Sequence, residues 1–111
     1  MTTSLKEYQE FTHHTNECKG HLLTLPHIIT GLVAELGELL QIYQFTTRNK
    51  LGALDDMDIR DVSSELGDVL WYISELANFY KLDLNEVLED NKNKINKRRA
   101  ARLGHIDPNS Y

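Results

Sequence analysis

Residues 28–43 read IITGLVAELGELLQIY, and residues 62–77 read VSSELGDVLWYISELA. In both segments apolar residues return every three or four positions, which is the spacing of one face of an α-helix. Charged residues interrupt both segments, so neither is a continuous apolar run of the roughly 20 residues that a membrane-spanning helix needs. We therefore predict two amphipathic helices that pack against other helices, and no membrane association.

Capping signals predict where these helices and a preceding one begin and end. Ser4 and Glu7 form a capping-box pattern that begins a first helix, expected to run to about Cys18. The second helix is expected from near Pro26, because proline is tolerated in a first turn, to about Thr47.

The next connection is rich in acidic residues. Residues 49–58 contain a glycine and several aspartates and are predicted to form a loop. Asp58 with Asp61 is expected to cap a third helix that runs to about Tyr80.

A fourth helix follows a short connection at residues 81–82. Asp83 with Glu86 repeats the capping pattern at its start. Gly104 is expected to end this helix and Pro108 to prevent its return, which leaves residues 103–111 as an irregular tail.

Four amphipathic helices with short connections can bury their apolar faces only against one another. The sequence therefore predicts an all-α protein with a four-helix bundle as its fold. Its 111 residues are the usual size of one domain, so residues 1–111 are expected to form a single domain. The apolar faces of the second and third helices are wide, which indicates that a second subunit covers part of them.

The formal net charge is −5, and the charges are unevenly distributed. An acidic chain is a poor general binder of nucleic acid, because phosphate backbones need a cationic surface. A single cysteine, Cys18, excludes an internal disulfide, and no signal-peptide pattern begins the sequence, so we expect a cytoplasmic protein. Half of the cations stand in one short segment near the C-terminus: Lys92, Lys94, Lys97, Arg98, Arg99 and Arg102.

The second and third helices each carry a pair of carboxylates three residues apart. Glu35 and Glu38 form the first pair, and Glu65 and Asp68 form the second. Residues at this spacing share one helix face, where like charges repel. A single pair of this kind usually belongs to a solvated helix face. Here both pairs stand among apolar residues, which favours a site where the four carboxylates converge.

Each pair also encloses a glycine, Gly37 or Gly67. A glycine inside a helix costs about 1 kcal/mol relative to alanine. Because glycine permits close backbone approach, we expect the two helices to cross closely at these two positions.

Converged carboxylates need a counter-charge, and oxygen-only ligands select hard cations. Mg²⁺ is the natural candidate, with Mn²⁺ as a substitute. Proteins usually hold Mg²⁺ with few carboxylates plus substrate phosphates, which indicates a phosphorylated substrate. Lys94 and Arg98, four residues apart on one helix face, would bind phosphate oxygens, although such basic runs are more often solvated helix ends. Tyr72 lies one turn after Asp68 on the acidic face and is a candidate for ligand contact.

Four segments together resemble the MazG-like all-α nucleoside triphosphate pyrophosphohydrolases. They are Tyr8-Gln9, residues 31–38 (GLVAELGE), residues 64–72 (SELGDVLWY) and the pattern Asn91-x-x-Lys94-Ile95-x-x-Arg98. The similarity covers about residues 8–99, nearly the whole chain. The combination of both acid pairs with the later basic pattern is specific, whereas either half alone is not.

The resemblance implies a magnesium-dependent hydrolase that cleaves (d)NTP between the α- and β-phosphates and gives (d)NMP and pyrophosphate. By matched position, Glu35, Glu38, Glu65 and Asp68 would be the catalytic metal ligands. The residues in contact with substrate would be Tyr72, Asn91, Lys94 and Arg98. Relatives are commonly homodimers or homotetramers whose sites are completed at subunit contacts.

The chain departs from the family pattern at two places. Relatives often carry a further acid just before each motif, where this chain has Ala34 and Ser64. The arginine of the basic pattern is commonly followed by Tyr-Pro, whereas here the sequence is Arg98-Arg99-Ala100.

Two alternatives remain open at the level of sequence. One is a related pyrophosphohydrolase that acts on phosphoribosyl-ATP or on dUTP. The other is a non-catalytic helical module that only dimerises or binds a partner. The sequence does not choose the base or the sugar.

Overall fold

Four α-helices form the protein in a computed structural model that describes residues 2–104. They are α1 (Leu5–Thr15), α2 (Thr24–Lys50), α3 (Asp56–Phe79) and α4 (Leu84–Leu103). No strand occurs within residues 2–104, so the prediction of an all-α, four-helix fold is confirmed. Leu103, placed in the irregular tail by the sequence, is the last residue of α4, and Gly104 is its C-cap. Residues 105–111 of the predicted tail, with Pro108, lie outside the described part.

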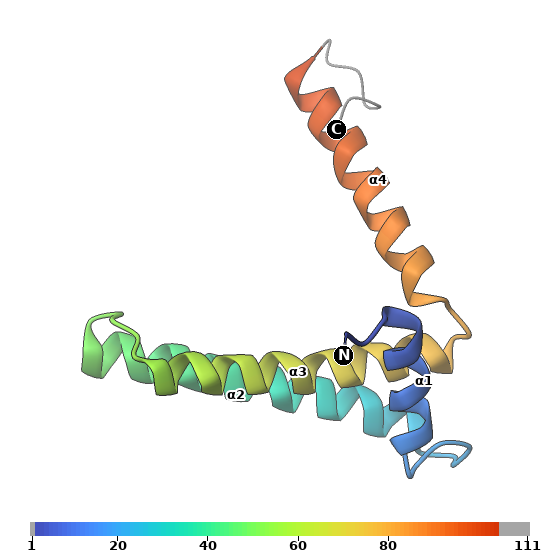
Figure 1. Cartoon of the computed structure of the whole chain (residues 1–111), viewed down its shortest axis with the longest axis horizontal. Coiled ribbons are helices and arrows are strands. Elements are labelled where there is room, and N and C mark those ends of the chain that lie inside the picture. The colour runs from blue at the N-terminus through green and yellow to red at the C-terminus, as the bar shows by residue number, and fades with distance from the viewer. Residues whose placement is uncertain (1, 105–111) are drawn as a thin grey trace.

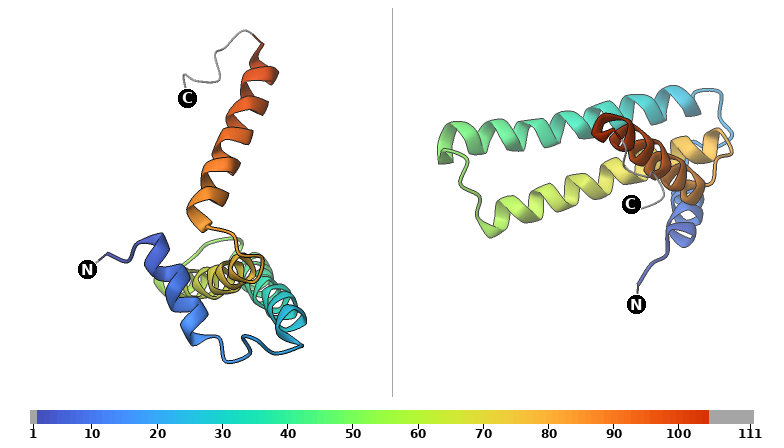
Figure 2. Two further views of the ribbon diagram at one scale, coloured as in Figure 1. Left: turned by 90° about the vertical axis from the view of Figure 1, so that its right-hand side faces the viewer. Right: turned by 90° about the horizontal axis from the view of Figure 1, so that it is seen from above.

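The helices form a flat group of three with the fourth projecting from it. α2 and α3 lie side by side and antiparallel, and α1 packs across the C-terminal part of α3 (Figure 1). α4 contacts α1 near its start and then extends away from α2 and α3 (Figure 2, left). One consequence is that α2 and α3 keep a large surface that no helix of the same chain covers.

The start of α3 differs from the prediction by one turn. Asp55, not Asp58, is the N-cap, and its carboxylate accepts a hydrogen bond from the Asp58 amide at 2.9 Å. Asp58 completes a capping box by accepting from the Asp55 amide at 3.1 Å. Lys50 pairs with both carboxylates, at 3.0 Å from Asp55 and 2.6 Å from Asp58, and so ties the end of α2 to the start of α3.

The ends of α1 and α2 also shift from their predicted places. α1 ends at Thr15 rather than near Cys18, because the Asn16 side chain turns away to Glu75 and to the Cys18 amide. α2 begins at Thr24, two residues before Pro26. Proline is accommodated in this first turn because the backbone amides there have no hydrogen-bond acceptor within the helix.

α2 also ends later than predicted, after Lys50 rather than near Thr47. Leu51 adopts a left-handed conformation with φ of 53° and ends the helix. The predicted starts of α1 and α4 are correct, because the side chains of Ser4 and Asp83 cap them.

The contact between α1 and α3 is polar at its centre. Glu75 is 1% exposed, and its carboxylate accepts hydrogen bonds from Thr12 at 3.0 Å, Asn16 at 2.7 Å and Asn78 at 2.6 Å. These three donors are neutral, and the imidazole of His13 lies 3.6 Å from the same carboxylate. Apolar burial is limited, since the buried apolar residues of the described chain are Ile28, Val69, Ala77, Leu84 and Ala100.

Candidate metal centre

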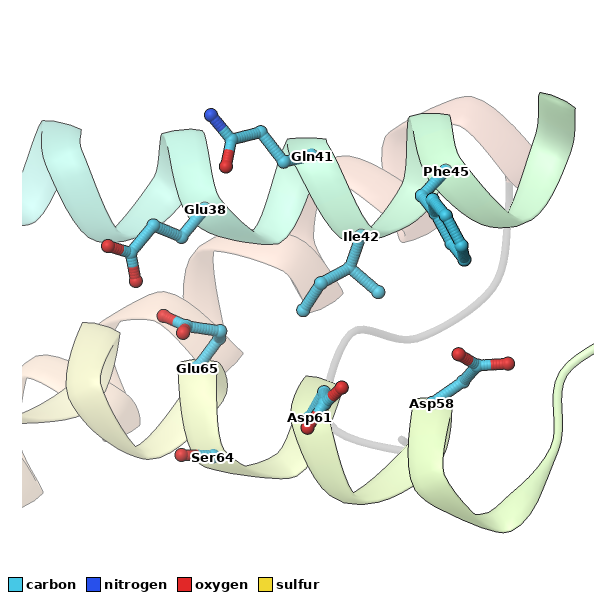
Figure 3. Close-up of a pocket in the computed structure, with 8 residues that line it drawn as sticks. All are labelled: Glu38, Gln41, Ile42, Phe45, Asp58, Asp61, Ser64 and Glu65. Atoms are coloured by element: carbon cyan, nitrogen blue, oxygen red, sulfur yellow. The ribbon is translucent and has the colours of Figure 1, made fainter. Parts of the chain in front are cut away.

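The antiparallel pairing of α2 and α3 brings three of the four predicted carboxylates together. Glu35, Glu38 and Glu65 each offer an oxygen, and these oxygens all lie within 4.8 Å of one another. Figure 3 shows Glu38 and Glu65 pointing toward each other across the space between the two helices. The spacing of three residues on α2 places both of its carboxylates on the face that meets α3.

The cluster is short of positive charge. Oε2 of Glu35 and Oε2 of Glu65 are buried and have no hydrogen-bond partner. Two carboxylates can share a hydrogen bond only when one of them carries a proton. A hydrogen bond to Glu35, followed by burial and by the nearby Glu38, raises the pKa of Glu65 to about 7. The same cluster would be satisfied by a divalent cation in place of the proton, and its oxygen-only donors fit a hard ion such as Mg²⁺.

Asp68 lies at the edge of the cluster rather than inside it. Its side chain is exposed, and it does not join the three close carboxylates. Its negative charge still reaches the site, because it contributes to the raised pKa of Tyr8 and of Tyr72, after burial in each case.

Tyr72 lies on the same side of α3 as the carboxylates, as predicted from its spacing. Burial first, and then the charges of Glu35 and Asp68, raise the pKa of its phenol. The ring is half-buried, makes an edge contact with Trp71 at 5.0 Å between centroids, and faces His27 at 6.4 Å. Sequence reasoning missed His27. It lies eight residues, or about two helical turns, before Glu35 on α2.

The expected close crossing at Gly37 and Gly67 is wrong. A Cβ added to either glycine would meet nothing within 4 Å, so the helices do not touch there. The close approach occurs almost two turns earlier on α2, at Gly31, where the ring of Tyr72 lies against the helix.

The predicted phosphate-binding residues are not at the cluster of their own chain. Asn91, Lys94 and Arg98 are exposed side chains on α4. Because α4 projects away from α2 and α3, these residues lie apart from the carboxylates (Figure 1).

A pocket continues from the carboxylates along the groove between α2 and α3. Its volume is about 460 Å³, within the usual range for small-molecule sites. Ile42 and Phe45 point into it from α2 (Figure 3). Its walls are acidic, so a phosphate group would enter only with a cation. The lining residues are Glu38, Gln41, Ile42, Phe45, Asp58, Asp61, Ser64 and Glu65.

Sequence reasoning missed most of this lining, although helical spacing could have found part of it. Gln41 and Phe45 follow Glu38 by three and seven residues, and Asp61 precedes Glu65 by four.

α2 also has the length and composition of a membrane-spanning helix. Its 27 residues include a window with mean hydropathy 1.2, of which 6% is buried. Length and composition are the only support for such a reading, and the helix carries two carboxylates of the cluster near its middle. Charged side chains are costly inside a bilayer.

Comparison with known families agrees with this geometry. Residues 5–103 match the model of a family described as the MazG nucleotide pyrophosphohydrolase domain. The chain belongs to the MazG family. The matched MazG segment contains both acid pairs and the whole of α4, and MazG domains generally depend on a divalent metal. The resemblance seen in the sequence is therefore confirmed.

A curated relative of this MazG chain is the gene 37 protein of Mycobacterium phage L5. The two are 36% identical over 75 residues, which cover 68% of this chain and 66% of the relative. The chain thus spans slightly less than two thirds of the length of that protein. The relative's name states no activity.

Proposed function

We propose that this chain is a Mg²⁺-dependent nucleoside triphosphate pyrophosphohydrolase that converts (d)NTP and water into (d)NMP and pyrophosphate. The observation that carries this proposal is the cluster of Glu35, Glu38 and Glu65, whose oxygens lie within 4.8 Å of one another. Two of its oxygens are buried without a partner, which is an unfavourable arrangement unless a cation or a proton is present. Membership of the MazG family supports the same chemistry.

The three close glutamates would hold the cation, and Asp68 is the fourth proposed ligand. A bound Mg²⁺ would orient the triphosphate, neutralise its charge and lower the pKa of an attacking water. Mn²⁺ is expected to substitute for it, since it also prefers oxygen ligands.

Side chains would accept the proton of the attacking water and stabilise the leaving pyrophosphate. A carboxylate of the α2 pair, Glu35 or Glu38, accepts a proton from the water as its oxygen bonds to the α-phosphorus. The bond from the α-phosphorus to the α–β bridging oxygen breaks, and pyrophosphate leaves with that oxygen. Lys94 and Arg98, with Asn91, would stabilise the charge that develops on the leaving pyrophosphate.

The position of α4 supports a site built from more than one chain. Since α4 carries its basic residues away from its own carboxylates, we infer that α4 of a second copy brings them to the site. A homodimer or homotetramer is therefore part of the proposal. A cytoplasmic location, where nucleotides are abundant, is part of it as well.

A substrate panel with the purified chain tests the proposal. NTPs, dNTPs, dUTP and phosphoribosyl-ATP are each incubated with Mg²⁺, and the release of pyrophosphate is measured. We expect hydrolysis that EDTA abolishes and that Mg²⁺ or Mn²⁺ restores. In ¹⁸O-labelled water the label should appear in the monophosphate, because the α-phosphorus is attacked.

Glu38→Gln tests the site itself. This variant should lose at least about 100-fold in kcat, because it removes one charge from the cation site without changing shape. Glu10→Gln, on the exposed surface of α1, is the matched control and should keep full activity. Full magnesium-dependent activity in Glu38→Gln would show that the site is wrong. The absence of pyrophosphate from every nucleotide would favour a non-catalytic helical module, and turnover of dUTP or phosphoribosyl-ATP alone would identify the related enzymes.

A further inference from the structure

Gly31 is the glycine of α2 at which another helix approaches most closely. A Cβ built on Gly31 would lie within 2.7 Å of Cε1, Cζ and Oη of Tyr72. Such a separation is far shorter than any real carbon contact, so no other residue type fits unless the ring moves. Gly37 and Gly67, the glycines of the acidic motifs, have open space at the same distance. Of these three helical glycines, only Gly31 has a neighbour that a side chain would meet.

The ring that fills this space belongs to the edge of the carboxylate cluster. Gly31 lies one helical turn before Glu35, and Tyr72 lies one turn after Asp68. Burial first, and then the charges of Glu35 and Asp68, raise the pKa of the Tyr72 phenol. None of the hydrogen bonds found within residues 2–104 uses that hydroxyl, and it lies with the ring edge against Gly31.

We propose that Gly31 is a positioning residue, which seats the Tyr72 ring in the space of its missing side chain and thereby places the phenol beside the nucleoside part of the substrate. This inference rests on the proposed pyrophosphohydrolase function. In the proposed enzyme, the glutamates would hold the cation and, through it, the phosphates. Tyr72, at the end of the cluster, would contact the nucleoside, which is attached to the α-phosphate. A bulkier residue at position 31 would push the ring away from α2 and out of this position.

The expected effect is on nucleotide affinity more than on turnover. Gly31→Ala displaces the ring without removing a charge or a cation ligand. Binding of a non-hydrolysable α,β-imido nucleoside triphosphate should therefore weaken by about tenfold, the factor for one lost aromatic contact. KM should rise by a similar factor with kcat within about twofold of wild type, and the affinity for Mn²⁺ alone should not change.

Trp71 provides a readout that does not depend on activity. It is the only tryptophan of the chain, and its ring centroid lies 5.0 Å from that of Tyr72. Gly31→Ala should change the Trp71 emission of the free protein, because the neighbouring ring moves. Nucleotide binding to the wild-type protein should also change this emission.

A double-mutant cycle with Tyr72→Leu separates positioning from a general effect on the helix. When the ring is absent, alanine at position 31 meets no clash, so Gly31→Ala should leave KM unchanged in the Tyr72→Leu background. In that background the melting temperature should rise, because alanine is favoured over glycine inside a helix. Tyr72→Phe keeps the ring, so in that background Gly31→Ala should still raise KM.

The outcomes distinguish this inference from the proposed function. An active wild-type protein with unchanged affinity and Trp71 emission in Gly31→Ala would overturn the positioning role alone. Parallel losses of Mn²⁺ affinity, melting temperature and kcat in Gly31→Ala would also overturn it, because the glycine would then be merely structural. A wild-type protein that neither hydrolyses nor binds nucleotides would overturn both.

Discussion

At the scale of single residues, Glu65 lies in a cluster of three carboxylates. It faces Glu35 and Glu38 across the helix pair, and a hydrogen bond to Glu35, followed by burial, raises its pKa to about 7. The ordinary value for this group is 4.5, so between these two pH values the folded chain binds a proton that the unfolded chain has lost. The cluster is thus a place where a proton and a divalent cation compete.

This competition predicts a pH dependence of stability in the absence of metal. In EDTA, the free energy of unfolding should fall as the pH rises from about 4.5 to about 7, because the folded state holds more protons than the unfolded state in that window. Urea denaturation at several pH values measures this slope. The side chain of the Glu65→Gln variant does not titrate, so the free energy of unfolding should depend less on pH in this variant. An equal slope in the variant would show that another group titrates.

At the scale of elements, Gln9 holds the junction of three helices. Its side-chain amide donates to Asn78 Oδ1 at 3.0 Å and to the Leu82 carbonyl at 2.7 Å. Its side-chain oxygen accepts from the Leu84 amide, the first of α4, at 3.0 Å. α4 has 20 residues, or about 30 Å of helix, so a small rotation at this junction moves its basic end by several ångströms.

We expect Gln9→Leu to loosen the start of α4 while the helices themselves remain. The loss of three hydrogen bonds, two of them to backbone groups, should lower the free energy of unfolding by about 2 kcal/mol. Amide hydrogen exchange should quicken at Leu84 before it does so in α2. Gln44→Leu, at an exposed position of α2, is the control. Unchanged exchange at Leu84 would show that Gln9 does not hold the junction.

At the scale of the whole molecule, several apolar side chains of α2 and α3 remain exposed on the surface. Val33 and Leu40 on α2 are 63% and 53% exposed, and Leu70 on α3 is 55% exposed. α4 adds Leu88 and Ile95 at 55% and 51%. Large apolar side chains exposed on three helices fit a subunit contact, which would remove them from water.

The chain is therefore expected to be a homo-oligomer in solution. Leu70→Lys should shift the protein to monomer in sedimentation experiments, and turnover should fall with it, since α4 of a second copy would no longer reach the carboxylates. The melting temperature of wild type should rise with protein concentration. Leu54→Lys, in the connection between α2 and α3, should leave the assembly intact. A fully active wild-type monomer would contradict this expectation.

Local sequence patterns were sufficient to predict the four helices and several of their ends. Ser4 and Asp83 cap the helices that they were expected to cap, and Gly104 ends the last one, because capping depends on contacts within three or four residues. The acid pairs were visible for the same reason, since residues three apart share a face in any helix. At Asp55 the local reading was wrong by one turn, because several aspartates in succession offer competing caps.

Only the tertiary structure decided which side chains meet. It placed Glu65 against Glu35 and Glu38, left Asp68 at the edge, seated Tyr72 on Gly31 instead of crossing the helices at Gly37 and Gly67, and turned α4 away from its own cluster. These outcomes depend on how two helices pair and on the volumes of the side chains between them. Such contacts join residues far apart in the chain, and no spacing along the sequence determines them.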